Sequence, residues 1–113
     1  MYKYRAQYLR NYDGDTVRFR VDLGFSIFMD MTVRLAYINT YELQDADTDL
    51  RERGYVAKYR VKELLEGAKE IIIETDKDKT GKYGRYLAEV YYDGVNLGQQ
   101  LMDEDLAEIY KGN

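Results

Sequence analysis

The feature that most constrains the fold is a strict alternation of apolar and polar residues in the first third of the chain. In residues 16–23 the apolar side chains fall on one parity and the polar ones on the other. The apolar set is Val17, Phe19, Val21 and Leu23, and the polar set is Arg18, Arg20 and Asp22. Successive side chains of a β-strand point to opposite faces, so this stretch predicts a strand with one buried face.

A longer alternating stretch, residues 25–38, follows Gly24. Its apolar parity holds Phe25, Ile27, Met29, Met31, Val33, Leu35 and Tyr37. This run exceeds a typical strand, so we expect two strands or one strongly bent strand. Arg34 has the opposite parity, and regular pleating directs it away from the face of Val33 and Leu35.

The rest of the chain predicts short strands and two helices. Residues 2–12, 69–76 and 86–92 have strand character, and residues 106–110 predict an extended tail that returns to the sheet. An apolar stripe at helical spacing consists of Ala57, Val61, Leu64, Leu65 and Ala68, and Gly67 is a candidate C-terminal stop of this helix. A shorter helix begins at Asn96, a good N-cap residue, and residues 41–53 predict a polar loop.

Many short strands with glycine turns and one inserted helix indicate a small closed barrel. We therefore predict a mainly β domain with α, a five-stranded OB-fold Greek-key barrel with one inserted helix and a short second helix. A chain of 113 residues is one domain, residues 1–113.

The composition excludes several chemistries. Cysteine and histidine are both absent, so disulfides, thiolate or imidazole metal sites and mechanisms with a histidine base or cysteine nucleophile are excluded. Any metal would be a hard cation held by oxygen atoms. No signal peptide or membrane-spanning run is recognisable, so we expect a cytoplasmic protein with no membrane partner.

The charge of the chain argues in both directions about nucleic acid. A net charge of −4 and a pI of about 4.9 disfavour general affinity for phosphates. The chain nevertheless has 17 lysines and arginines that could cluster locally. Its 13 tyrosines are either packing residues or stacking platforms for bases.

Three short motifs carry the chemistry. The first is the turn of Asp13, Gly14, Asp15 and Thr16, and the second is Arg34 followed by Asn39, Thr40 and Glu42. The third is Lys82, Tyr83, Gly84 and Arg85. Two guanidinium groups with several carboxylates are suited to metal-assisted chemistry at a phosphate group.

The order and spacing of these motifs resemble the staphylococcal-nuclease-like (thermonuclease) family. The resemblance covers nearly the whole chain, and it implies an OB-fold enzyme that cleaves DNA and RNA phosphodiesters with Ca²⁺. It implies that Arg34 and Arg85 grip the scissile phosphate and that Glu42 activates or positions the attacking water.

The resemblance also implies the ligand positions. Asp15, Asn39 and the backbone carbonyl of Thr40 would hold the calcium ion. Lys82 and Tyr83 would contact the terminal phosphate of a nucleotide.

Three departures from the family pattern affect these expectations. Asn39 stands where the family has a second acidic ligand, so we expect weakened calcium binding. Tyr41 replaces a proline before Glu42, which makes the loop less rigid. The sequence ends at Asn113, before the family's last helix, so we expect a truncated domain. The surface that this helix would cover is then exposed, and we expect a partner or a second copy of the chain, in a homo-oligomer, to cover it.

Two functions follow. The first is a metal-dependent nuclease that hydrolyses DNA or RNA with little sequence specificity. The alternative is a non-catalytic module of the same fold that binds nucleic acid or protein.

Overall fold

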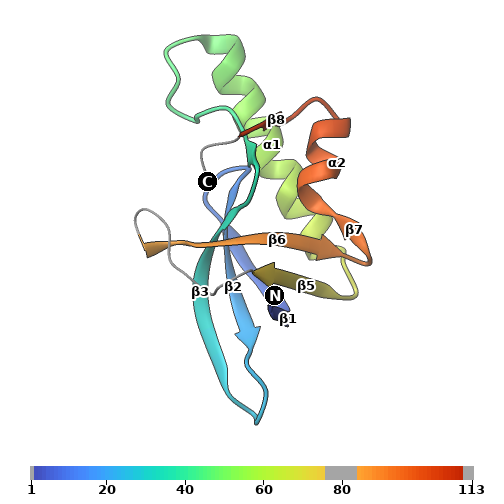
Figure 1. Ribbon diagram of the computed structural model, residues 1–113. Coiled ribbons are helices and arrows are strands. Elements are labelled where there is room, and N and C mark those ends of the chain that lie inside the picture. Colours follow the sequence, from blue (N-terminus) through green and yellow to red (C-terminus); the bar gives the residue numbers. More distant parts are fainter. Residues whose placement is uncertain (1, 76–83, 111–113) are drawn as a thin grey trace.

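Five strands close into a barrel in the computed structural model, which describes residues 2–75 and 84–110. The strands are β1 (Tyr2–Asn11), β2 (Thr16–Asp22), β3 (Phe28–Leu35), β5 (Ile71–Thr75) and β6 (Tyr86–Tyr92). They are hydrogen-bonded in the order β3-β2-β1-β5-β6, and a parallel pairing of β3 with β6 completes the ring (Figure 1). The predicted five-stranded OB-fold barrel is confirmed.

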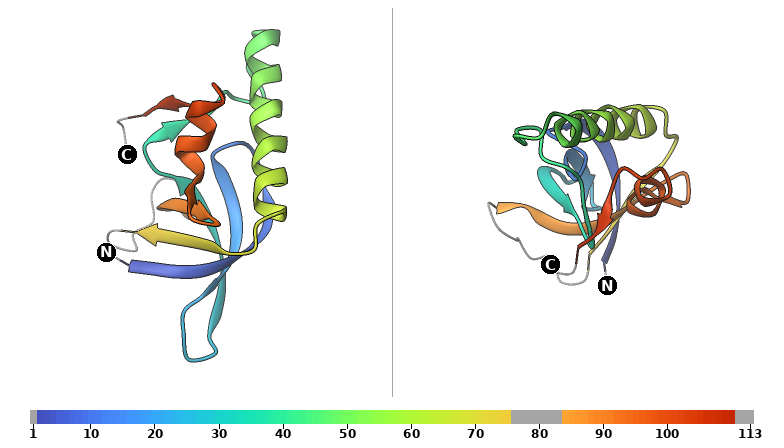
Figure 2. Two further views of the ribbon diagram at one scale, coloured as in Figure 1. Left: turned by 90° about the vertical axis from the view of Figure 1, so that its right-hand side faces the viewer. Right: turned by 90° about the horizontal axis from the view of Figure 1, so that it is seen from above.

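The alternating residues of β2 form the centre of the core. Val17, Phe19 and Val21 are all fully buried, whereas Arg20 on the other parity is exposed. The barrel is covered on one side by α1 (Thr48–Glu66) and near β6 by α2 (Leu97–Asp103) (Figure 2). The predicted stripe on α1 is also confirmed, with Ala57, Val61 and Leu65 buried.

Helix α1 begins earlier than the sequence predicted. Residues 41–53 were expected to be a loop, but the helix begins at Thr48. The Asp47 side chain caps it by accepting hydrogen bonds from the backbone nitrogens of Asp49 and Leu50. Capping compensates for the low helix propensity of this acidic segment, so the prediction of a long loop was wrong.

Only the middle of the alternating stretch of residues 25–38 forms strand β3, because a turn interrupts the stretch at each end. Gly24, Phe25 and Ser26 all have positive φ angles, of 83°, 54° and 62°, and form the tip of the β2–β3 hairpin. Phe25 is 96% exposed, so its place in the predicted apolar face was wrong. At the other end, a turn with Tyr37 at φ 68° separates β3 from the short strand β4 (Ile38–Asn39).

The C-terminal segment is extended as predicted, but it forms a separate two-stranded sheet and does not rejoin the barrel sheet. After β7 (Val95–Asn96), the Asn96 side chain caps α2 by accepting from Gln99 N at 3.0 Å. Strand β8 (Glu108–Ile109) then pairs with β4. Strand β8 and Tyr110 thereby lie beside the turn that follows β3, where the Tyr110 nitrogen donates to the Tyr37 carbonyl oxygen at 2.8 Å.

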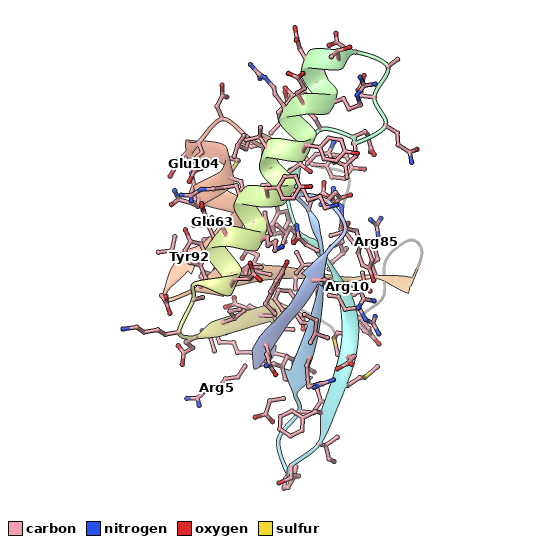
Figure 3. All side chains as sticks on the ribbon, turned by 180° about the vertical axis from the view of Figure 1, so that it is seen from behind. Arg5, Arg10, Glu63, Arg85, Tyr92 and Glu104 are labelled. Carbon is pink, nitrogen blue, oxygen red and sulfur yellow. The ribbon has the colours of Figure 1, made fainter. Side chains whose placement is uncertain are left out.

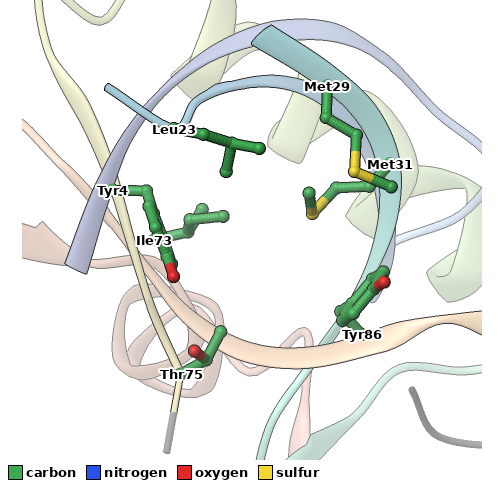
Figure 4. A pocket seen from close by; sticks show the side chains of 7 residues that line it. All are labelled: Tyr4, Leu23, Met29, Met31, Ile73, Thr75 and Tyr86. Carbon is green, nitrogen blue, oxygen red and sulfur yellow. The ribbon is translucent and has the colours of Figure 1, made fainter. Parts of the chain in front are cut away.

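One end of the barrel is open. A cavity of about 150 Å³ is present there (Figure 4), lined by Tyr4, Leu23, Met29, Met31, Ile73, Thr75 and Tyr86. Within residues 2–75 and 84–110, neither helix has the length and apolarity that a membrane span requires.

Candidate active site

The turn between β1 and β2 is packed tightly against two other elements. A Cβ atom on Gly14 would lie 2.7 Å from Cγ2 of Thr40 and 2.9 Å from Cβ of Ala57 on α1. Only glycine fits this close approach. The turn is therefore fixed between the segment after β4 and the helix, and it presents Asp15 at the end of the barrel.

Asp15 is buried and well supplied with donors. Its Oδ2 atom accepts from the backbone nitrogen of Thr40 at 3.0 Å and from the Thr40 hydroxyl at 3.2 Å. Its Oδ1 atom accepts from the Thr16 hydroxyl at 3.3 Å. These bonds compensate for burying a carboxylate that is only 6% exposed and fix its orientation.

Arg34 is the centre of a second set of contacts. Its Nη1 atom donates to the carbonyl oxygens of Leu35 at 2.6 Å and Ile38 at 2.9 Å. Its Nη2 atom donates to Oδ1 of Asn39 at 3.0 Å and lies 3.6 Å from Oδ2 of Asp15. The guanidinium is thus held by the turn between β3 and β4 and faces the Asp15 carboxylate.

Arg85 approaches the same turn from β6. Its Nη1 atom donates to the Thr16 hydroxyl at 3.2 Å. The register explains this, since Thr16 pairs with Arg34 and Arg34 pairs with Leu87, two residues after Arg85. Parallel closure of the barrel therefore brings both predicted arginines to the turn of Asp15 and Thr16.

Glu42 is exposed on the loop that leads into α1. A Cβ atom on Gly54 would lie 2.6 Å from the carbonyl oxygen of Tyr41 and 3.3 Å from that of Glu42. Gly54 thus holds this loop against the helix. Among residues 2–75 and 84–110, no ion pair joins the Glu42 carboxylate to Arg34, whose guanidinium is bonded to Leu35, Ile38 and Asn39.

The predicted site residues differ in how the structure places them. Asp15, Thr40, Arg34 and Asn39 form one connected cluster, and Arg85 joins it through Thr16. Lys82 and Tyr83, the predicted substrate contacts, lie outside the described residues. The chemical roles of all these residues stay predictions.

The carboxyl group of Asp13 has a raised pKa. Burial, and then the neighbouring negative charge of Asp15, raise the pKa of Asp13 to about 6. Its Oδ1 atom accepts from the backbone nitrogen of Asp15 at 3.0 Å. Asp13 therefore shapes the turn and adds negative charge beside Asp15 near neutral pH.

The donor set is compatible with a hard cation, though with little charge. No group of three or more acidic, histidine or cysteine side chains suited to a metal occurs in the part of the chain that the structure describes. The oxygens of Asp15 and Asn39 nevertheless converge on the same Arg34 nitrogen, and both are ligand types that Ca²⁺ accepts. A single carboxylate would give a weak site, as the substitution at position 39 predicts.

Two functional positions were missed by the sequence analysis. Gly54 holds the Glu42 loop against α1, and a glycine inside a helical pattern is a signal of close backbone approach. Tyr110 lies with its ring centre 5.6 Å from the Arg34 guanidinium carbon. No local pattern could have indicated that contact, because it depends on the pairing of β8 with β4.

The barrel and its arginine-lined acidic turn define a domain of the staphylococcal-nuclease-like class. Residues 32–113 match the family described as staphylococcal nuclease homologue. The chain belongs to this family.

Two similar proteins come from Bacillus subtilis (strain 168). The SPbeta prophage-derived endonuclease YokF is 37% identical over 101 residues, which is 88% of this chain and 32% of that protein. Endonuclease YncB is 36% identical over 101 residues, 88% of this chain and 45% of that protein. The chain thus spans less than half the length of these relatives.

Proposed function

We propose that this domain is a metal-dependent nuclease that hydrolyses phosphodiester bonds of DNA or RNA with little sequence specificity. The observation that carries the proposal is the contact of Arg34 with Asp15 and of Arg85 with the adjacent Thr16. Two permanent positive charges therefore converge on one small acidic turn. The names of the two relatives, both endonucleases, are consistent with this function.

Arg34 and Arg85 have different proposed roles. Both Nη1 hydrogens of Arg34 are used by backbone carbonyls, so this residue acts mainly as a fixed positive charge. Arg85 is half-buried and donates to the Thr16 hydroxyl, and a planar guanidinium fork matches the geometry of phosphate oxygens. A fixed cation and a directed donor together stabilise the charge that develops on the phosphoryl oxygens during attack.

Glu42 is the proposed base. Its exposed carboxylate is anchored through its backbone rather than its side chain, so it can accept a proton from a water molecule that attacks phosphorus. The bond from water oxygen to phosphorus forms as the bond to the leaving sugar oxygen breaks, and that oxygen takes up a proton from solvent water. Tyr41, which precedes Glu42, is also fixed by its hydroxyl donating to Oε1 of Glu108 at 3.1 Å.

Asp15, Asn39 and the Thr40 carbonyl would hold the cation, which we propose is Ca²⁺. When bound, such a cation supplies positive charge for phosphate oxygens and orders water beside them. Because Asn39 carries no charge, the affinity should be low, and millimolar concentrations are suitable for a first assay.

A non-catalytic binding module is the second candidate. It is favoured by the single carboxylate of the cation site and by the engagement of Arg34 Nη1 with carbonyls. Such a module would bind nucleic acid through the same arginines without hydrolysing it.

Cleavage assays separate the two functions. Plasmid DNA, single-stranded DNA and RNA would be incubated with Ca²⁺, Mn²⁺, Mg²⁺ or EDTA. The proposal expects cleavage with a divalent cation, none in EDTA, and a large loss in Glu42→Gln. Binding without cleavage in every metal would support the binding module instead.

A further inference from the structure

A broad hollow lies beside Arg85, on the outer surface of β2 and β3. Its volume is about 650 Å³, and its wall includes Tyr12, Arg18, Met29, Arg85 and Tyr86. Thr16 also lines it, and this is the residue that joins Arg85 to the Asp15 turn. The hollow is therefore continuous with the proposed phosphate-binding position.

Two guanidinium groups on this surface donate to neutral hydroxyls rather than to carboxylates. Arg10 on β1 is the register partner of Arg18 on β2, which places like charges opposite each other. Arg18 donates to the Thr32 hydroxyl at 3.0 Å, and Arg10 donates to the Tyr12 hydroxyl at 3.2 Å. In residues 2–75 and 84–110 neither arginine forms an ion pair, and opposed like charges of this kind are unfavourable without an anion.

Arg20, the next arginine along β2, does form an ion pair. Arg20 is paired with Asp30 through two hydrogen bonds, of 2.8 and 3.2 Å. Asp30 lines the hollow, and the bond to Arg20, with smaller contributions from the charges of Arg18 and Arg10, lowers its pKa, so one carboxylate faces several arginines. Arg10, Arg18 and Arg85 thus form a positive surface on a chain of net charge −4. Figure 3 shows Arg10 and Arg85 on the same side of the molecule, and Arg5 toward the other end of β1.

Flat and flexible side chains accompany these charges. Tyr12 is 44% exposed and Met29 is 43% exposed, and Tyr86 is half-buried in the wall. The Arg10 guanidinium carbon lies 5.5 Å from the centre of the Tyr12 ring, which keeps that ring in place. Aromatic rings beside arginines bind unstacked bases of single strands, whereas bases in a duplex are stacked and inaccessible to them.

We propose that this hollow binds a nucleotide adjacent to the scissile phosphate of a single-stranded nucleic acid. The backbone phosphate of this nucleotide is contacted by Arg18 and Arg10. Its base is contacted by Tyr12, Tyr86 and Met29. The inference rests on the proposed function only for the position of the scissile phosphate. It predicts that single strands are bound more tightly than duplexes of the same length.

Binding can be tested without cleavage. The full chain carrying Glu42→Gln would be titrated, with Ca²⁺ present, into a fluorescein-labelled oligothymidine and into a labelled duplex. Arg18→Gln should weaken single-strand binding about tenfold and lower the salt slope by about one. Tyr12→Ala should weaken it about tenfold with no change in slope, and Tyr12→Phe should retain most of the affinity because the ring remains.

Arg5→Gln is the control, because it removes one arginine charge from the neighbouring strand β1, where Arg5 pairs with Glu70 and does not line the hollow. It should change affinity less than twofold. Thermal unfolding of each variant checks that it is folded. The inference is overturned if Arg18→Gln and Tyr12→Ala bind like Arg5→Gln, if the duplex binds more tightly, or if no single strand binds.

The parent chain is assayed for cleavage in parallel. Absence of cleavage together with the expected binding pattern would reject the proposed nuclease and keep this binding site. Cleavage without that pattern would reject the site and keep the nuclease.

Discussion

The Arg34 guanidinium and the Asp15 carboxylate face each other at 3.6 Å, and their side chains are only 10% and 9% exposed. This buried pair links the turn after β1 to the end of β3. Breaking a buried pair by removing one partner leaves an uncompensated charge, which costs about 3–5 kcal/mol.

Asp15→Ala is therefore expected to lower the free energy of unfolding by about 3 kcal/mol, because Arg34 loses its carboxylate. Urea unfolding measures the effect. Arg20→Gln is the control, since the Arg20–Asp30 pair is exposed and should contribute far less. Similar losses in both variants would contradict the importance of the buried pair.

Gly54→Ala is expected to reduce both stability and cleavage. An alanine in a helix normally stabilises it relative to glycine by about 0.5–1 kcal/mol, but here its Cβ would lie 2.6 Å from the Tyr41 carbonyl oxygen. The loop with Glu42 must move, and we expect a loss of about 1–3 kcal/mol.

Gly67→Ala is the matched control at the end of the same helix. Its Cβ would meet the Glu63 carbonyl oxygen at 3.4 Å, an ordinary contact, and its φ of −84° suits alanine. Its stability should change by less than about 0.5 kcal/mol. Equal effects of the two alanines in urea unfolding would show that the Gly54 contact is unimportant.

The contact between α1 and α2 should make stability depend on pH. Arg60 donates to both carboxylate oxygens of Glu104, at 2.8 and 3.0 Å, and this bonding, with a contribution from Gln100, lowers the pKa of Glu104 from its usual range. A lowered carboxyl pKa stabilises the fold above the unfolded pKa, and the stabilisation is lost as the pH falls through the folded pKa.

The free energy of unfolding of the parent should therefore exceed that of Glu104→Gln near pH 6, and this difference should disappear as the pH falls to about 3. Urea midpoints of both proteins across that range measure the difference. A difference that is independent of pH would show that the ion pair does not stabilise the fold.

Asn39→Asp is expected to strengthen calcium binding. The aspartate keeps an oxygen for Arg34 Nη2 and adds a second negative charge beside Asp15. We expect the dissociation constant for Ca²⁺ to fall about tenfold by calorimetry. Asp45→Asn is the control, because the Asp45 side chain accepts from the Asp47 nitrogen in the loop before α1 and is not part of the predicted ligand set. An unchanged affinity in Asn39→Asp would place the cation elsewhere.

The sequence predicted the features that depend on local patterns. Alternation in β2, the apolar stripe of α1 and the Asn96 cap are all present because neighbouring residues determine them. Alternation alone does not report burial, because Phe25 shares the parity of Val33 and Leu35 and yet lies at a solvent-exposed hairpin tip.

Contacts between residues far apart in the sequence could not be predicted from such local patterns. The bond from Arg85 to Thr16 spans 69 positions and requires the parallel pairing of β3 with β6. The sequence motifs indicated which residues should meet, whereas only barrel closure shows how Arg34 is buried against carbonyls and Arg85 is placed at the hollow.

The most direct test of the account is the single-turnover rate of cleavage of a single-stranded oligonucleotide with saturating Ca²⁺, in the parent, Glu42→Gln and Arg85→Gln. The account predicts metal-dependent cleavage that falls about 10²–10³-fold in each variant, while the free energy of unfolding stays nearly constant. Parental rates in either variant, or no cleavage by the parent, would contradict it.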